Sequence, residues 1–378
     1  MLSICNVALV TPEGLLSDSS ILMDDTILAI NPPQLTTTAE KLDGGGRFLF
    51  PGFVDTHIHG LEGFDVMYGT EAVRQMALRL PKYGVTAFVP TTVSAEPEAV
   101  TQALHGIRAA RARQERDGLG ARILKAHLEG PYLAPARRGA HRPETLCEPN
   151  TAVLEAFADV LGRVTVAPEL PGAEGFIRRA VELGIHVNLG HTNADAETCL
   201  RALEWGADGF THVFNAMSGI DHRAPGAAAA ALRSGAWLEV IADGIHLHPQ
   251  LVSMLHKLAH GRVVLITDAM EAAGLPEGRY DLGGLTVEAR SGAVRLADGT
   301  LAGSMLTMNR AAQNYCWFTG ADEVRTAEAA CVHPAAFCGQ GGWLGSLAVG
   351  YAADAVLINA DGSVFQTIIG GVPVSGEE

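Results

Sequence analysis

The chain has 378 residues, of which 48% are hydrophobic and 18% are charged. This composition excludes an intrinsically disordered chain, which would be poorer in apolar residues. Six cysteines are too few for a disulfide scaffold. The formal net charge of −15 excludes a free-standing nucleic-acid binder, because such proteins present a basic face. The length allows one large domain and one small one.

The cysteines form no Cys-x-x-Cys pair, so we expect small buried thiols in a reducing compartment. The first residues, 1–14, have no basic segment and only a short apolar run, which predicts a strand rather than a signal peptide. Apolar stretches stay well below the ~18 residues of a membrane span. The sequence therefore predicts a cytoplasmic protein without a membrane or nucleic-acid partner.

Both ends of the chain alternate short β-like runs with turn residues. Near the start these runs are Ser3–Val10 and Ser20–Ile30, and near the end they are Ala355–Ile358 and Phe365–Ile369. This pattern predicts one small β domain built from residues 1–50 and 349–378. The larger catalytic domain is then expected over residues 51–348.

The middle of the chain alternates apolar, β-branched runs with amphipathic helical segments. Ser94 is the expected N-cap of one such helix, with Pro97 in its first turn. Strands that alternate with helices predict an α/β fold with a parallel sheet, and eight of them fit a closed TIM-like (β/α)8 barrel. A doubly wound sheet is the alternative, but no Gly-x-Gly-x-x-Gly motif follows the first strand. The eight predicted strands are Phe53–Ile58, Thr86–Val93, Ile123–Leu128, Arg163–Ala167, His186–Leu189, Gly209–Val213, Trp237–Ala242 and Val263–Thr267.

Imidazoles and carboxylates gather at the ends of these predicted strands, where a barrel enzyme has its active site. The first strand ends in a His-x-His pair, whose side chains point to the same face of the strand. The pair alone is a weak signal, because His246-Leu247-His248 is a second instance in this chain. The combination is far more specific, since imidazole and carboxylate suit divalent ions such as zinc. The predicted metal cluster is His57, His59, Glu129, His191, His212 and Asp268.

Several motifs extend this pattern to a known family. Residues 51–59, Pro-Gly-Phe-Val-Asp-Thr-His-Ile-His, resemble the opening strand of the amidohydrolase superfamily. Six further blocks, in family order up to about residue 308, resemble the N-acetylglucosamine-6-phosphate deacetylase family. The terminal β segments are similar to that family's small β-sandwich domain, so the resemblance covers nearly the whole chain. The six blocks are His127–Tyr132, Gly190–Ala194, Thr211–Met217, Asp243–His246, Ile266–Met270 and Leu301–Met308.

The resemblance implies an enzyme of amino-sugar catabolism that hydrolyses the acetamide of N-acetyl-D-glucosamine 6-phosphate to D-glucosamine 6-phosphate and acetate. It implies that Glu129, His191 and His212 hold the principal metal and that His57 and His59 can hold a second. We expect one or two divalent ions per subunit, with zinc preferred over iron, manganese or cobalt.

Amide hydrolysis needs an activated water, a polarised carbonyl and a protonated leaving amine. The resemblance assigns the acid/base role to Asp268, and a carboxylate beside the metal-activated water is suited to it. It also implies that His141 approaches the substrate amide or sugar, where it would help to polarise the acetyl carbonyl.

The resemblance further implies that Asn215, the Ala216 backbone, Arg223 and His246 bind the sugar phosphate, and that a homodimer completes these contacts. One departure is Ala224, which stands where the family has glutamate in a His-Arg-Glu-Pro-Gly motif. The cation is retained and its neighbouring carboxylate is lost. Because the whole chain is acidic, Arg223 and His246 are expected to matter most for KM.

Two alternatives remain open from the sequence. One is the same chemistry on N-acetylgalactosamine 6-phosphate, which differs at a single hydroxyl. The other is a non-catalytic amidohydrolase-like barrel that serves as a binding module. Such modules usually lose metal ligands, whereas this chain keeps the expected set.

Overall fold

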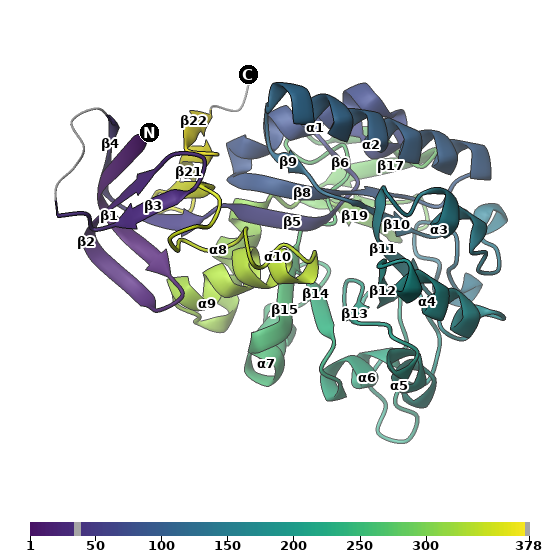
Figure 1. Cartoon of the computed structure of the whole chain (residues 1–378). Coiled ribbons are helices and arrows are strands. Elements are labelled where there is room, and N and C mark those ends of the chain that lie inside the picture. The colour runs from purple at the N-terminus through teal and green to yellow at the C-terminus, as the bar shows by residue number, and fades with distance from the viewer. Residues whose placement is uncertain (34–38, 375–378) are drawn as a thin grey trace.

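The computed structural model describes residues 1–33 and 39–374. Residues 34–38 and 375–378, which fall in the two halves of the predicted small domain, lie outside the described residues. The chain forms a parallel barrel covered by helices, with a smaller sheet at one end of the molecule (Figure 1).

All eight predicted barrel strands are present, and each pairs in parallel with the next one along the chain. The ring closes between the last and first strands, where the Asp268 backbone N–H donates to the His57 carbonyl at 2.9 Å. The prediction of a TIM-like barrel is confirmed. The strands are β5 (Phe53–Ile58), β8 (Val85–Thr92), β10 (Ala126–Glu129), β11 (Leu161–Val166), β12 (His186–Leu189), β13 (Gly209–Phe210), β14 (Trp237–Ile241) and β15 (Val263–Ile266), with the short β9 (Arg122–Ile123) beside β8.

Helices surround the barrel because their apolar faces pack against strands that are themselves buried on both sides. In α2, for example, Val100, Leu104 and Ile107 are buried. The predicted N-cap of this helix is wrong: Glu96 occupies the cap position, and Ser94 lies buried near the barrel mouth. The helices are α1 (Thr70–Arg79), α2 (Pro97–Asp117), α3 (Ala152–Ala156), α4 (Ala173–Glu182), α5 (Ala196–Glu204), α6 (Ala227–Arg233), α7 (Pro249–Ala259), α8 (Met308–Thr319), α9 (Glu323–Ala327) and α10 (His333–Phe337).

The two ends of the chain meet in one seven-stranded sheet of order β22-β21-β20-β4-β1-β2-β3, which confirms the predicted small β domain (Figure 1). The sheet has its own apolar core, which includes Leu9, Ile21 and Leu357. In this sheet β20 pairs antiparallel with β4. Its strands are β1 (Leu2–Thr11), β2 (Gly14–Met23), β3 (Ile27–Ile30), β4 (Glu40–Pro51), β20 (Ala355–Ile358), β21 (Val364–Ile369) and β22 (Val372–Val374).

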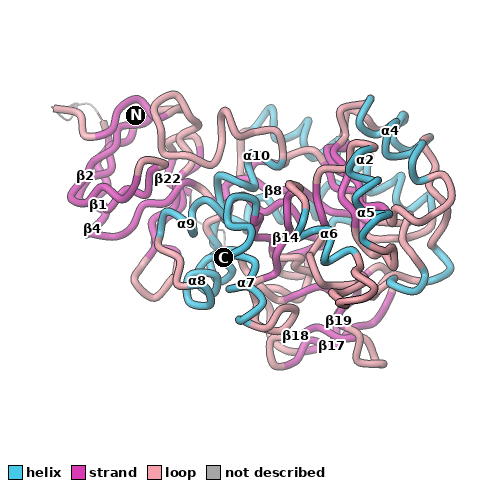
Figure 2. The backbone as a smooth tube through the Cα atoms, turned by 90° about the horizontal axis from the view of Figure 1, so that it is seen from below, coloured by secondary structure: helices cyan, strands magenta, loops and turns pink. Residues whose placement is uncertain are grey.

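A four-stranded antiparallel sheet interrupts the barrel pattern between β15 and α8. It occupies the Gly-rich stretch and lies beside the barrel, away from the small terminal sheet (Figure 2). Its strands are β16 (Gly278–Leu282), β17 (Leu285–Arg290), β18 (Ala293–Arg295) and β19 (Leu301–Ser304), and the short pair β6 (Gly60–Leu61) and β7 (Phe64–Asp65) follows the first barrel strand. None of the helices in the described ranges is long and apolar enough to cross a membrane.

Candidate metal centre

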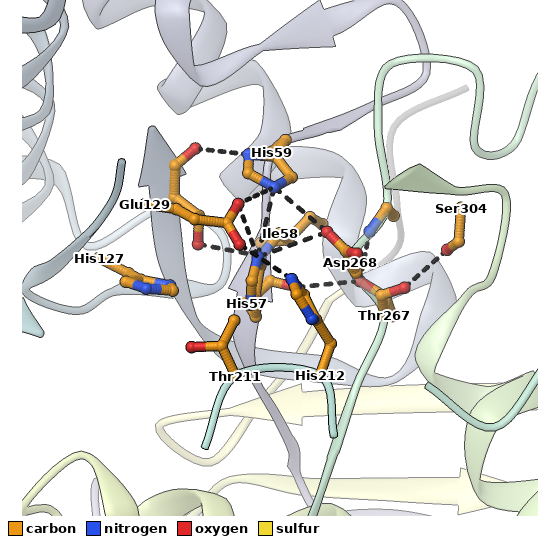
Figure 3. A network of polar contacts seen from close by, with 12 residues as sticks. His57, Ile58, His59, His127, Glu129, Thr211, His212, Thr267, Asp268 and Ser304 are labelled. Carbon is orange, nitrogen blue, oxygen red and sulfur yellow. Dashed lines mark hydrogen bonds and ion pairs between the residues drawn. The ribbon is translucent and has the colours of Figure 1, made fainter. Parts of the chain in front are cut away.

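Glu129 stands at the centre of the strand-end cluster and faces a pair of imidazoles with each of its oxygens. Figure 3 shows Glu129 with three of these four imidazoles, those of His57, His59 and His212. Its Oε2 lies 3.1 Å from His59 Nε2 and 3.4 Å from His57 Nε2. Its Oε1 lies 3.1 Å from His212 Nε2 and 3.3 Å from His191 Nε2. The structure therefore brings all five predicted ligands together, with the carboxylate between two nitrogen pairs.

Asp268 completes one side of this arrangement. Its Oδ1 is 3.2 Å from His59 Nε2 and 3.4 Å from His57 Nε2. The residue adopts a φ of 49°, an uncommon left-handed conformation, two residues after the end of β15. Burial raises the pKa of this carboxyl, but the charge of His57 and the hydrogen bond with His59 outweigh burial and hold the pKa well below its usual range. Asp268 is thus an ionised base at the mouth of the barrel.

The hydrogen bonds behind the imidazoles fix which ring nitrogen carries the hydrogen. His59 Nδ1 lies 3.2 Å from the Thr91 carbonyl, and His191 Nδ1 lies 2.9 Å from the Arg137 carbonyl. A carbonyl can only accept, so each Nδ1 carries a hydrogen, and Nε2 is the nitrogen that has a lone pair when the ring is neutral. His57 Nδ1 has a carboxylate behind it instead, Glu239 Oε2 at 3.1 Å.

This donor set fits a divalent metal. His191 Nε2 and His212 Nε2 face each other at 3.1 Å, and His57 Nε2 and His59 Nε2 at 3.3 Å. In neutral rings these nitrogens would face each other with lone pairs, which repel, and a cation between them would remove the repulsion. Three groups of side chains each place their candidate ligand atoms within 4.8 Å of one another: His57 with His59 and Asp268, Glu129 with His191 and His141, and His57 with His127 and Glu239. Imidazole and carboxylate together suit zinc and its neighbours in the first transition row.

Proton occupancy in the bare cluster follows from the same contacts. Burial alone would lower the pKa of His59, but hydrogen bonds to Asp268 and Glu129, together with their charges, raise it to about 9. Burial also opposes ionisation of Glu129, yet the surrounding imidazoles hold the pKa of this carboxyl well below its usual range. The bare cluster therefore holds protons on nitrogens that a metal would take over.

His141 lies beside the cluster but has the opposite tautomer. Its Nδ1 accepts a hydrogen bond from the Ser94 backbone N–H at 3.2 Å, so its Nε2 carries the hydrogen. That Nε2 is 3.8 Å from Glu129 Oε2. Burial, followed by the nearby charge of His191, lowers the pKa of His141 to about 3. His141 is therefore a neutral hydrogen-bond donor rather than an electron-pair donor.

A cavity of about 460 Å³ opens onto this centre. Its wall includes most residues that the sequence analysis placed in the site. Two predicted residues do not line the cavity of this chain: His57, which is fully buried, and Arg223, which lies on the loop 218–225, where residues 219–225 are exposed. His246 does line it, with Nδ1 held by Asp243 Oδ2 at 2.6 Å. The predicted residues in the wall are His59, Glu129, His141, His191, His212, Asn215, Ala216, His246 and Asp268.

Four features of the site were missed in the sequence. Arg137 and Arg295 line the cavity, and the four-stranded sheet supplies part of the wall through Leu282 and Leu301. For Arg137 a signal existed, because it lies four residues before His141. Glu239 was missed although a charged residue within the apolar strand Trp237–Ala242 points to a buried polar role.

The comparisons with known proteins agree with this architecture. The model of the amidohydrolase family matches residues 48–374. The N-acetylgalactosamine-6-phosphate deacetylase of Escherichia coli O157:H7 is 40% identical over 96% of each chain, and the N-acetylglucosamine-6-phosphate deacetylase of Vibrio furnissii is 38% identical over 94% of this chain and 90% of its own.

Among solved structures, the N-acetylglucosamine-6-phosphate deacetylase of Pasteurella multocida has a TM-score of 0.93 at 29% identity, covering 98% of this chain and 99% of its own. The enzyme of Mycobacterium smegmatis, solved as a variant in complex with N-acetyl-D-glucosamine-6-phosphate, has a TM-score of 0.89 at 32% identity over 99% of both chains. The family model matches residues 48–374, and the cluster lies at the strand ends of the barrel. The chain therefore belongs to the amidohydrolase family.

Proposed function

We propose that this protein hydrolyses the acetamide of N-acetyl-D-glucosamine 6-phosphate, giving D-glucosamine 6-phosphate and acetate. The observation that carries the proposal is the complete cluster, with Glu129 between two imidazole pairs and the Asp268 carboxylate at its edge. Relatives at 38% and 36% identity, from Vibrio furnissii and Bacillus subtilis, carry the name of this activity. A non-catalytic barrel would have no use for an intact cluster beside an ionised base.

In this reaction Asp268 takes a proton from the attacking water. The water oxygen bonds to the acetyl carbon, the carbon–nitrogen bond breaks, and the same proton passes from Asp268 to the departing nitrogen. His141 directs its Nε2–H toward the acetyl carbonyl oxygen, where negative charge develops. One residue thus moves the proton and the other stabilises the oxygen.

The residues Glu129, His191 and His212 would hold one divalent ion, and His57 and His59 would hold a second. When bound, such an ion polarises oxygen ligands and makes water acidic enough to react near neutral pH. Zinc is the preferred metal, because imidazole-rich sets with one carboxylate suit it, and iron, manganese and cobalt are the alternatives.

The phosphate group is proposed to lie near Asn215, the Ala216 backbone and His246 in the cavity wall. Ala216 has a φ of 49°, which turns its peptide groups away from a regular helical or extended path. Arg223 lies outside this wall, on an exposed loop. We propose that it acts in a homodimer, in which the loop of one subunit meets the site of the other.

The substrate test compares two sugars. Metal-loaded protein is incubated with the 6-phosphates of N-acetylglucosamine and N-acetylgalactosamine, and acetate release gives kcat/KM for each. We expect the glucosamine derivative to be preferred, as the names of the Vibrio and Bacillus relatives and the Mycobacterium complex suggest. A higher kcat/KM for the galactosamine derivative would favour the activity named for the Escherichia relative. No acetate from either sugar would refute the proposal.

A further inference from the structure

The buried carboxylate of Glu239 lies beneath the cluster and has not been given a role. It is at the middle of β14 and has no exposed surface. Its Oε2 is 3.1 Å from His57 Nδ1 and accepts a hydrogen bond from the His212 backbone N–H at 3.3 Å. One oxygen therefore contacts a member of each imidazole pair.

The second oxygen of Glu239 is also occupied. Oε1 accepts a hydrogen bond from Asn188 Nδ2 at 3.2 Å, and Asn188 Oδ1 in turn accepts one from Arg163. The Arg163 side chain is anchored further by a hydrogen bond to the Phe337 carbonyl of α10. The carboxylate is thus fixed from behind by residues of β11, β12 and α10, and it has little freedom to turn.

The contact at His57 differs from those behind the other imidazoles. His59 and His191 donate their Nδ1–H groups to neutral backbone carbonyls, those of Thr91 and Arg137. His57 alone of these three donates to a carboxylate. A carboxylate acceptor fixes the tautomer, holds the ring in place and makes the opposite nitrogen a stronger electron-pair donor.

The contact at His212 acts on the backbone. His212 has a φ of 28°, an uncommon value for a residue with a side chain. Its Nδ1 has no hydrogen-bond partner among the described residues, so nothing behind the ring fixes its orientation. The hydrogen bond from its own N–H to Glu239 is therefore a main restraint on how this residue presents Nε2 to Glu129.

We propose that Glu239 is a positioning residue that aims His57 and His212 at the metal centre and strengthens His57 as an electron-pair donor. This inference rests on the proposed metal-dependent function. It predicts that Glu239 controls metal affinity most strongly at the position of His57 and His59. Glutamine at this site keeps the shape but loses the charge and one acceptor, so either His57 or Asn188 is left without its partner.

The test compares E239Q with wild type and with a matched control, E271Q. Glu271 is also buried and accepts hydrogen bonds from Tyr68 and the Asp281 backbone, but it contacts no imidazole of the cluster. Each protein is freed of metal and equilibrated with zinc at buffered free concentrations, and bound zinc per chain is measured by elemental analysis. The melting temperature of each metal-free protein reports whether it is folded.

We expect the more weakly bound of the two zinc ions to have a dissociation constant about 10- to 100-fold higher in E239Q than in wild type. In E271Q both zinc dissociation constants should stay close to the wild-type values. We also expect excess zinc to restore much of the lost kcat of E239Q. If E239Q is folded and both of its zinc dissociation constants lie within twofold of the wild-type values, the inference is overturned. A lower melting temperature of metal-free E239Q with unchanged zinc affinity would do the same, because it would show a purely structural role.

The binding measurement needs no substrate, so it is independent of the sugar specificity. If wild type binds zinc but releases no acetate from either sugar, the proposed function fails and the comparison of zinc affinities still decides the role of Glu239. If E239Q itself does not fold, E239D provides the second variant. Its shorter side chain keeps the charge but cannot reach both His57 and His212, and the same loss of zinc affinity is expected.

Discussion

The Ser94 backbone N–H donates to His141 Nδ1 across 3.2 Å and so places the hydrogen of this imidazole on Nε2, toward the cavity. The neighbouring His191 has the reverse arrangement, because its Nδ1 donates to a carbonyl. The centroids of the two rings are 4.7 Å apart, and the rings make an edge-to-face contact. Adjacent imidazoles thus have different chemical roles, and a backbone contact rather than residue type sets the difference.

Replacement of His141 by alanine should lower kcat by about 100- to 1000-fold, the usual effect of removing a donor to a developing oxyanion. Metal content should stay at the wild-type value, because the Nε2 of His141 carries a hydrogen and offers no lone pair. Glutamine at this position supplies an N–H and should retain more activity than alanine. Steady-state kinetics and elemental analysis check both points, and loss of a metal ion from H141A would contradict the assignment.

Replacement of Asp268 by asparagine should lower kcat by at least about 100-fold, because the base that moves the proton is lost. The imidazoles and Glu129 remain, so the variant should still bind metal and substrate. Acetate release measures kcat, and isothermal calorimetry measures sugar binding. The exposed Asp298 offers a control, since D298N should turn over like wild type. Near wild-type turnover by D268N would remove Asp268 from its role.

Replacement of His246 by glutamine should raise KM for the phosphorylated sugar by about 10- to 100-fold, the range for a hydrogen bond to a charged group. KM for unphosphorylated N-acetylglucosamine should change little, because His246 is proposed to contact the phosphate. H260Q is the control, because His260 is exposed and lies outside both the cavity wall and the loop 218–225. Equal increases in KM for both sugars would mean that His246 acts on the fold of the site and not on the phosphate.

Replacement of Arg223 by glutamine tests the proposed homodimer. If the loop 218–225 reaches the site of a second subunit, R223Q should raise KM only for the phosphorylated sugar, as H246Q does. Analytical ultracentrifugation of wild type should then show a dimer at assay concentration. A monomeric protein whose KM is unaffected by R223Q would exclude this arrangement.

Asp65 should make stability depend on pH. It is 2% exposed, and burial raises its pKa to about 7 from 3.8 despite a hydrogen bond from the Met67 backbone. Between these two values the unfolded chain releases a proton that the folded chain keeps. Stability therefore falls as pH rises through this window, by about 1.4 kcal/mol for each unit, and levels off above it.

Asparagine at position 65 keeps an acceptor for Met67 and has no proton to release. The melting temperature of D65N should therefore exceed that of wild type by a larger margin at pH 8 than at pH 5. Thermal unfolding at the two pH values provides the measurement. If the difference in melting temperature between D65N and wild type is the same at pH 5 and pH 8, the raised pKa of Asp65 is contradicted.

The sequence predicted the parts of the fold that depend on strong periodic patterns. The strand Phe53–Ile58 was predicted with its exact bounds, because a buried parallel strand is apolar on both faces. The helix start at Ser94 was wrong, because the local cap pattern competes with a tertiary contact: the Ser94 N–H is used by His141, and the helix begins only at Pro97. Cap patterns carry no information about such distant partners.

The candidate site divides in the same way. Residues at strand ends, such as His191 and Asp268, could be placed because the barrel topology brings all such ends to one rim. The tautomer of His141 could not be predicted, since it depends on a backbone group 47 positions away. Arg295 reaches the cavity from the four-stranded sheet, whose position beside the barrel is a matter of tertiary packing.

The seven-stranded sheet has a consequence for biosynthesis. Strand β20 pairs on one side with the central strand β4, near the start of the chain, and on the other with β21, near the end. The ribosome makes the N-terminal strands first. One edge of β4 therefore stays unpaired until its partner, about 300 residues further along the chain, has been synthesised. Until β20 is made, the edge of β4 has no partner, so synthesis and docking of β20 is the step that protects this edge from aggregation.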